Sequence, residues 1–191
     1  MNRKTAIKTI LSFVVLAGTS GVIYDFFKHG EPVPLKSLPQ KKLLIAELAE
    51  VIIPRTDTPG AKDAKVEDYI IKMITENTDD KARKSFLTGL GALEQYTAAN
   101  YQKLFVNCDK NEKIEILNHF EDKANYSFRI LNKINKKYFG NPFFFQLRDL
   151  TAEGYSTSFL GATKGMAYDY IPVNYEACIP LKKDQLAWAT K

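Results

Sequence analysis

Side chains that commonly carry catalysis or bind metals are few in this sequence of 191 residues, and they lie far apart. The two histidines are His29, in a proline-rich stretch, and His119, beside Phe120 in a predicted helix. Neither stands at ligand spacing from a second histidine or a cysteine, so the sequence predicts no metal site. The two cysteines, Cys108 and Cys178, form no CxxC motif. In an exported protein they are compatible with one disulfide or with two separate free thiols.

Motifs that bind phosphates or activate a nucleophile are also missing. The segment GATKG, from Gly161 to Gly165, lacks the Gly-Lys-Ser/Thr ending and the preceding strand of a phosphate loop, so we interpret it as turn glycines. The most suggestive polar cluster is Arg148, Asp149 and Glu153, in which the spacing of Arg148 and Glu153 is poor for a local ion pair. Without a nucleophile or a cofactor motif nearby, the cluster is more typical of contacts with another helix or a partner. The sequence therefore predicts no catalytic, cofactor-binding or metal-binding residue.

The positive charge of the chain is concentrated at its start. The formal net charge is +5, and residues 1–30 hold four basic residues and one acidic residue, which leaves +2 for the remainder. A nucleic-acid-binding protein would gather basic residues on one face. The short basic clusters around Arg83 and Lys136 have acidic neighbours or fit solvated helix faces. We expect no nucleic-acid partner.

The first 27 residues have the layout of an export signal. A basic stretch, Met1–Lys8, precedes the uncharged and mostly apolar Thr9–Ile23. The apolar run is shorter than the ~20 residues of a transmembrane helix. The start resembles a twin-arginine signal with Lys4 in place of the second arginine, so the export route stays open. Residues 1–27 are predicted to be a signal peptide or membrane anchor; a buried helix of a cytosolic domain is the alternative.

Apolar residues at helical spacing dominate the rest of the chain and predict an all-α fold. We expect an extended linker over residues 28–40 and a helical domain over 41–191, a compact bundle of about five to six helices. Helices are predicted from a capping box at Ser37 and Gln40 to Pro54, and over Val66–Thr75, Asp79–Phe105, Lys110–Lys123, Tyr126–Tyr138 and Pro142–Ser156. From Phe159 the sequence becomes an irregular Gly/Pro/aromatic segment.

Some residues within these helices predict how the helices begin and pack. Gly89 and Gly91 interrupt a long helix, which indicates close approach of another helix. The acidic pair Asp79-Asp80 suits a helix start because carboxylates there interact favourably with the helix dipole. Asn141 and Pro142 suit the N-cap and first position of the last helix.

Two stretches resemble a known family. Residues 48–64, LAEVIIPRTDTPGAKDA, and residues 150–181, LTAEGYSTSFLGATKGMAYDYIPVNYEACIPL, are similar to the signature and C-terminal stretches of the gluconate 2-dehydrogenase small subunit (subunit 3) family. The resemblance is carried by Ile52, Ile53, Pro54, Asp57, Pro59, Gly60 and Ala61, and by Gly165, Tyr168, Pro172, Tyr175, Cys178, Pro180 and Leu181. Two departures are Lys4 in the signal and Val173-Asn174 where a Pro-Gly turn is common.

What the resemblance implies is a partner. Members of this family are small subunits of periplasmic, membrane-associated sugar or polyol dehydrogenases. A flavoprotein large subunit of the glucose-methanol-choline type carries FAD, and a cytochrome c subunit carries haem c. The small subunit aids maturation or export of the flavoprotein. The resemblance thus implies a non-catalytic accessory subunit that binds no cofactor itself and is periplasmic or anchored facing the periplasm.

Residues whose presence cannot be explained by packing in the core alone are expected to form the partner interface. They are Pro54, Arg55, Asp57, Pro59, Gly60, Arg148, Glu153, Tyr168, Tyr170 and Tyr175. The alternative for the tyrosines is that they merely cap the helical core. For the whole chain, the alternatives are a stand-alone envelope-anchored structural or interaction protein and an enzyme in its own right.

Overall fold

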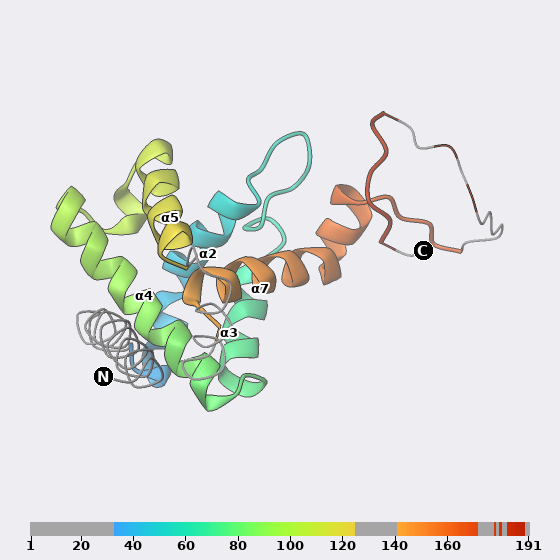
Figure 1. Ribbon diagram of the computed structural model, residues 1–191. Helices are drawn as coiled ribbons and strands as arrows, with labels where there is room; N and C mark the ends of the chain where they lie inside the picture. Colours follow the sequence, from blue (N-terminus) through green and yellow to red (C-terminus); the bar gives the residue numbers. More distant parts are fainter. Residues whose placement is uncertain (1–32, 125–140, 172–177, 179, 181–182, 190–191) are drawn as a thin grey trace, which may run out of the picture.

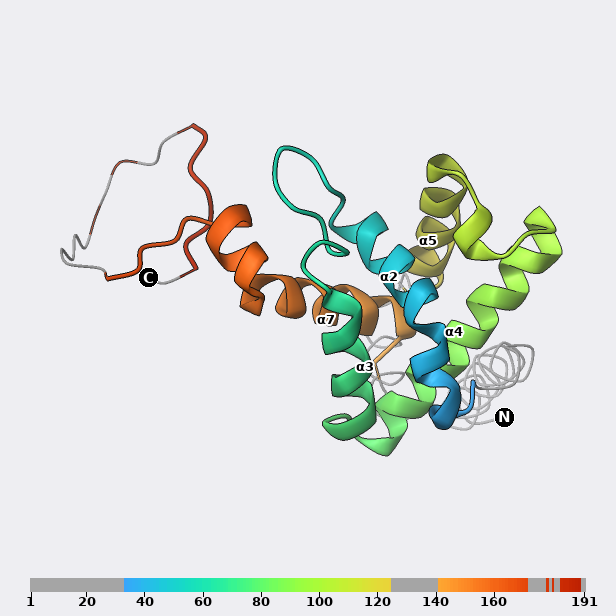
Figure 2. The same ribbon diagram turned by 180° about the vertical axis from the view of Figure 1, so that it is seen from behind.

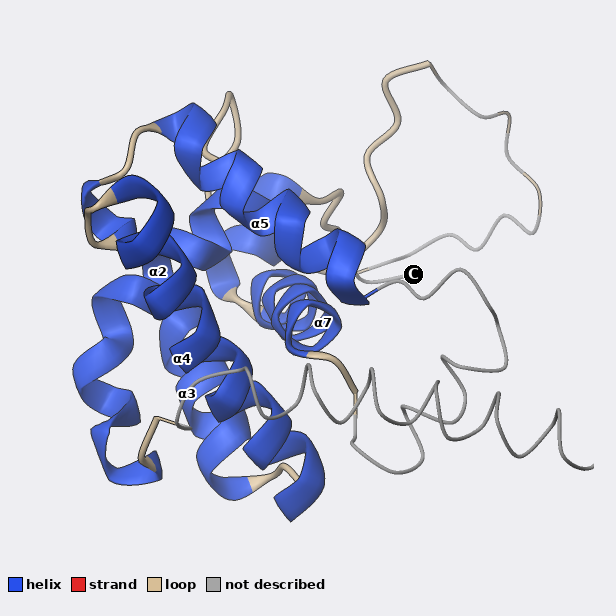
Figure 3. Ribbon diagram, turned by 60° about the vertical axis from the view of Figure 1, so that its left-hand side comes forward, coloured by secondary structure: helices blue, strands red, loops and turns tan. Residues whose placement is uncertain are grey.

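The computed structural model describes residues 33–124, 141–171, 178, 180 and 183–189. The predicted signal, the predicted helix over 126–138 and Tyr175 lie outside these residues. Within them the regular structure is helical, apart from an isolated β-bridge between Ala167 and Trp188. The prediction of an all-α bundle is confirmed (Figures 1 and 3).

The described helices are joined by short connections, except for the loop of residues 53–65 between α2 and α3 and the stretch between α5 and α7, most of which lies outside the described residues. In chain order they are η1 (Leu35–Lys41), α2 (Lys42–Ile52), α3 (Val66–Glu76), α4 (Asp80–Tyr101), η2 (Phe105–Asn107), α5 (Lys110–Ala124), α7 (Phe143–Thr157) and η3 (Gly161–Gly165). η1 and η2 are 3₁₀ helices, and η3 is a single π-helical turn. None of these helices is long and apolar enough to cross a membrane.

Helix α7 lies at the centre of the bundle. It packs against α2, α3, α4 and α5, and Figure 3 looks almost along its axis with these helices beside it. Leu147 is fully buried, and Phe143 and Phe144 at the start of the helix are nearly so. The ring of Phe143 contacts those of Phe86 in α4 and Phe120 in α5, at centroid distances of 5.2 and 6.1 Å. The core therefore forms around the apolar side of this one helix.

Two glycines allow α7 to approach its neighbours closely. A Cβ atom at Gly89 in α4 would overlap Cβ and Cγ of Phe143. A Cβ atom at Gly154 in α7 would lie 2.8 Å from the ring of Tyr69 in α3. The predicted reason for a glycine at position 89, close approach of another helix, is confirmed.

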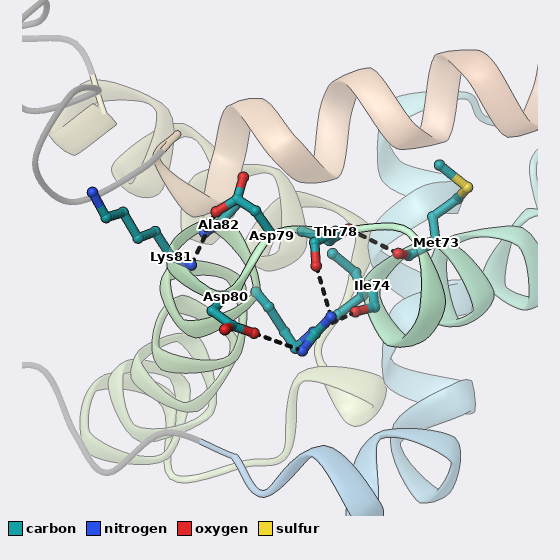
Figure 4. Close-up of polar contacts among 8 residues, drawn as sticks. Met73, Ile74, Thr78, Asp79, Asp80, Lys81 and Ala82 are labelled. Atoms are coloured by element: carbon teal, nitrogen blue, oxygen red, sulfur yellow. Dashed lines mark hydrogen bonds and ion pairs between the residues drawn. The ribbon is translucent and has the colours of Figure 1, made fainter.

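The turn between α3 and α4 is held by side chains that cap the two helix ends (Figure 4). Asp79 is the N-cap of α4, and its carboxylate accepts hydrogen bonds from the backbone N–H groups of Lys81 and Ala82 at 2.9 and 3.0 Å. The Arg83 guanidinium donates to the carbonyls of Ile74 and Thr78, at 3.0 and 2.7 Å. These hydrogen bonds satisfy backbone carbonyls at and just after the C-terminal end of α3. The Arg83 guanidinium is therefore engaged within the bundle and does not contribute to a basic binding surface.

The first described segment differs from its prediction. The extended linker is wrong for its last residues, because Leu35–Lys41 forms η1 and Leu38 is fully buried. The capping box is also wrong: the Ser37 hydroxyl donates to the Pro34 carbonyl at 2.7 Å, and the N-cap of α2 is Lys41. Burial of Leu38 supplies the free energy that orders a proline-containing segment.

Two other helix boundaries differ from their predictions. The long helix ends at Tyr101 rather than Phe105, because Gln102 adopts the left-handed conformation at φ 54°. Leu104, which follows this end, is exposed. The N-cap of α7 is Pro142 rather than Asn141, with Phe143 as its first residue.

Glu47 of α2 forms the most enclosed ion pairs of the described bundle. Its carboxylate contacts Lys113 of α5 at 2.9 Å and Lys62 of the following loop at 2.5 Å. Burial acts to raise the pKa of Glu47, but the hydrogen bonds from Lys62 and Lys113 outweigh it, so the pKa lies below its ordinary value. This carboxylate therefore ties α2, α5 and the loop together in its ionised form.

The Gly89→Ala substitution is expected to destabilise the protein although alanine favours helices. The gain in helix propensity is about 1 kcal/mol, whereas overpacking against the fixed Cβ of Phe143 costs about 1–3 kcal/mol. We expect a lower urea midpoint at unchanged m-value. Gln95→Ala, at an exposed position of the same helix, should change the free energy of unfolding by less than about 0.5 kcal/mol. A stabilised Gly89→Ala variant would contradict the close approach of α7.

The Glu47→Gln substitution is expected to have a pH-dependent effect. The folded pKa is lowered, so the ion pairs stabilise the fold above the unfolded pKa, and this contribution is lost as the pH falls through the folded pKa. The variant should be less stable by about 1–2 kcal/mol at pH 7, with the difference shrinking below about pH 4. Urea unfolding at both pH values measures this. The control is Asp57→Asn, and a difference for Glu47→Gln that stays constant with pH would refute the explanation.

Candidate partner-binding surface

The loop between α2 and α3 is folded around the carboxylate of Glu50. One carboxylate oxygen accepts the N–H of Arg55 and the other accepts the N–H of Lys62, both at 2.9 Å. Gly60 packs directly on this group: a Cβ atom there would lie 2.5 Å from Glu50 Oε1 and 2.7 Å from the nitrogen of Arg55. The Ala61 N–H also donates to the Ile53 carbonyl at 2.9 Å. Residues 53–62 therefore form a closed loop with Glu50 at its centre.

Most of the predicted interface residues of this loop face outwards. Pro54, Arg55 and Asp57 are exposed, Pro59 is half-buried and Gly60 is buried. The side chain of Arg55 forms an ion pair with Asp63 at 3.5 Å. Gly60 consequently acts through the loop shape, and the other four residues are available for contact.

Tyr155, near the end of α7, joins this loop to the C-terminal segment. Its hydroxyl donates a 2.7 Å hydrogen bond to the Pro59 carbonyl, and its side chain is buried. Gly165 also packs against this ring, and a Cβ atom there would overlap the phenol oxygen of Tyr155. Loop and segment also lie side by side at the end of α7 in Figures 1 and 2. One tyrosine thus contacts both stretches that carry the family resemblance.

The chain leaves α7 through a sharply defined turn. Ser158 is extended at ψ 152° and ends the helix. Its hydroxyl donates to the Tyr155 carbonyl at 2.7 Å and accepts the Gly161 N–H at 2.9 Å. A Cβ atom at Gly161 would overlap that same carbonyl. The interpretation of GATKG as turn glycines is wrong, because Gly161–Gly165 forms the π-helix η3, and both of its glycines pack on Tyr155.

After α7 the chain forms an arm, which includes η3 and projects from the bundle (Figures 1 and 2). We define the arm as the described residues 158–171 and 183–189. Ala167 pairs with the strand-like end of the arm, donating to the Ala187 carbonyl and accepting from the Ala189 N–H, both at 2.9 Å. The large apolar side chains that the arm exposes are Phe159 at 79%, Tyr168 at 43%, Tyr170 at 83%, Ile171 at 66% and Leu186 at 48%.

Two of the predicted interface residues lie elsewhere on α7. Arg148 pairs with its neighbour Asp149 at 2.7 Å and stacks over the Phe145 ring at 5.0 Å, as expected from its poor spacing to Glu153. Glu153 hydrogen-bonds to Tyr69 of α3; burial first, and then this carboxylate, raise the pKa of Tyr69. The polar cluster is thus engaged within the bundle and does not extend the loop and arm.

The sequence left two interpretations of the tyrosines, contact with a partner or capping of the helical core, and the structure distinguishes them for Tyr168 and Tyr170. Tyr170 is far too exposed to cap the core, and Tyr168 is also exposed. The residue that caps the core is Tyr155, which sequence reasoning missed. The sequence did contain one indication of close packing at Tyr155, which stands between Gly154 and Gly161 in the C-terminal stretch. Its contact with Pro59, almost a hundred residues away in the chain, cannot be predicted from local spacing.

The remaining titratable candidates are structural. The ring of His119 stacks on Tyr96 at 4.1 Å. Cys108 is buried, which raises the pKa of its thiol, and Cys178 is exposed; both are free, so the disulfide is not formed. Among the described residues, no group of three or more His, Cys, Asp or Glu side chains is placed to hold a metal ion.

A comparison with protein families decides the relationship. The model of the protein family gluconate 2-dehydrogenase subunit 3 matches residues 39–174, well over half of the chain. The chain belongs to the gluconate 2-dehydrogenase subunit 3 family. No curated protein and no solved structure matches it. The family match includes the Glu50 loop, Tyr155 and the first half of the arm, so this surface is part of the subunit 3 domain.

The Glu50→Ala substitution is expected to open the loop. The loop would lose two hydrogen bonds to a charged acceptor, and a loss of about 1.4 kcal/mol in local opening corresponds to about tenfold faster proteolysis. The measurement is the initial rate of trypsin cleavage after Arg55, followed by mass spectrometry. Asp57→Ala, in the same loop but without a hydrogen bond from its side chain to the described residues, is the matched control. Equal cleavage rates in the Glu50→Ala variant and the unsubstituted protein would show that Glu50 does not hold the loop.

Proposed function

We propose that this chain is a non-catalytic accessory subunit of a flavin-dependent sugar or polyol dehydrogenase complex. Membership of the subunit 3 family makes it part of a dehydrogenase assembly. The observation that carries the accessory role is the surface at the end of α7, where a fixed loop and a projecting arm expose aromatic and apolar side chains. A concentration of exposed apolar side chains on one segment indicates a protein interface.

The division of chemistry within the complex is what the family resemblance implies: FAD on a glucose-methanol-choline type large subunit and haem c on a cytochrome c subunit. The residues of the sequence are consistent with it, since no nucleophile stands with a base, no dinucleotide motif is present, and the two histidines are far apart. The role of this chain in the proposal is to support maturation or export of the flavoprotein.

The proposed location is the periplasm, in solution or anchored facing it. The support is the basic start followed by the uncharged run Thr9–Ile23. The N-terminal mass of the purified protein distinguishes a cleaved signal from a retained anchor. An intact N-terminus in the cytosolic fraction would argue against export.

The decisive experiment is isolation of the full chain, carrying a C-terminal tag, from its native host. We expect a flavoprotein to co-purify, recognised by the absorbance of bound flavin and by mass spectrometry, and dye-linked sugar oxidation to follow that flavoprotein. Recovery of the chain alone, from both the periplasmic and the membrane fractions, would favour a stand-alone envelope protein. Sugar oxidation by the chain without any flavoprotein would favour an enzyme.

A further inference from the structure

We infer that the apolar side chains of the arm are the anchor that binds the flavoprotein subunit, and that Tyr155 is the positioning residue that aligns this anchor with the Glu50 loop. This inference rests on the proposed function, and names the surface and the kind of partner surface it fits. The occupant is a complementary apolar patch on the flavoprotein.

The distribution of exposed apolar side chains singles out the arm. Of the eight large hydrophobic residues exposed among the described residues, five lie in the arm. The other three, Leu43, Leu104 and Ile114, come from three separate segments of the bundle. Single exposed hydrophobic residues are ordinary, whereas a gathered set that leaves its apolar area in water indicates a binding surface.

The charge of the arm favours an apolar protein partner over nucleic acid or an anionic membrane. Residues 158–191 of the sequence hold four lysines, Lys164, Lys182, Lys183 and Lys191, and three acidic residues, Asp169, Glu176 and Asp184, so their charges nearly balance. Nucleic acid and anionic lipid surfaces both select an excess of basic residues. A neutral, aromatic surface instead fits the uncharged centre of a protein interface, where tyrosine and phenylalanine are enriched.

Tyr155 fixes the orientation of the arm and its apolar side chains relative to the bundle. The first part of the arm contains η3, which packs on α7, and the glycines at both ends of η3 pack against Tyr155. The same side chain donates to Pro59 in the loop. Because loop and arm share this one buried contact, the exposed Arg55 and Asp57 are held in register with the aromatic side chains. Such preorganisation lowers the entropy cost of binding.

The test measures the molar ratio of flavin to tagged chain recovered from the native host. Tyr170→Asp removes a highly exposed side chain, so folding should be unchanged, and we expect the ratio to fall about tenfold or more. The matched control is Leu104→Asp, at an exposed leucine just after α4. The C-terminal end of α4 lies on the opposite side of the bundle from the arm (Figure 1). This control should retain the unsubstituted ratio.

The positioning role is tested with Tyr155→Phe, which removes the hydrogen bond to Pro59 but keeps the ring. We expect the ratio to fall about threefold to tenfold, since preorganisation rather than contact is lost. Tyr69→Phe is the matched control, because it removes a tyrosine hydrogen bond between α3 and α7 whose partner, Glu153, belongs to neither the loop nor the arm. If the flavin ratio fell equally in both variants, in proportion to their loss of thermal stability, Tyr155 would have a structural role only. Should Tyr155→Phe fail to fold, Tyr170→Asp still decides the anchor.

The outcomes separate the inference from the proposed function. If the unsubstituted chain recovers no flavin, the proposed function fails. If it recovers flavin and Tyr170→Asp recovers as much, the arm is not the anchor. A Tyr170→Asp variant that keeps its flavin but changes the oligomeric state of the isolated chain would make the arm a self-association surface. One that keeps its flavin but leaves the membrane fraction would make it a lipid contact.

Discussion

The close packing of α7 against α3 and α4 is the constraint on which the rest of the structure depends. Gly89 and Gly154 are the two points where a side chain would separate the helices, and each faces an aromatic ring of its neighbour. Phe143, held against Gly89, contacts rings from both α4 and α5. With its start and its last turn fixed in this way, α7 holds the root of the arm in a defined place.

A second set of contacts transfers this rigidity from the helices to the loops. Glu50, near the end of α2, binds two backbone N–H groups of the following loop, and Tyr155, near the end of α7, binds a carbonyl of the same loop. Two helix ends therefore hold one loop from opposite sides. The arm is fixed by glycines rather than by large buried side chains, because its root must lie directly against the ring and carbonyl of Tyr155.

Much of the bundle could be predicted from the sequence because its signals are local. Helical periodicity identified α3, α5 and α7, and a favourable carboxylate at a helix start placed Asp79. η1 could not be predicted in this way, because Pro39 and the neighbouring prolines are typical of a linker until Leu38 finds its buried site. Arg83 and Tyr155 were missed for the same reason: each acts on a carbonyl of another segment. In the candidate surface, the sequence indicated the exposed residues of the loop and arm, while the contact that joins them emerged only from tertiary packing.

The placement of aromatic residues explains how a chain without recognisable catalytic groups can serve a dehydrogenase complex. Phe86, Phe120 and Phe143 are buried and contribute to folding, whereas Phe159 and Tyr170 remain in water. Their apolar area contributes no folding free energy, so in the proposed complex it contributes to association instead. A projecting arm would lose much of this contribution if it had to become ordered on binding. The contacts at Tyr155 reduce that loss, and this links the close packing of α7 to the affinity expected at the far end of the arm.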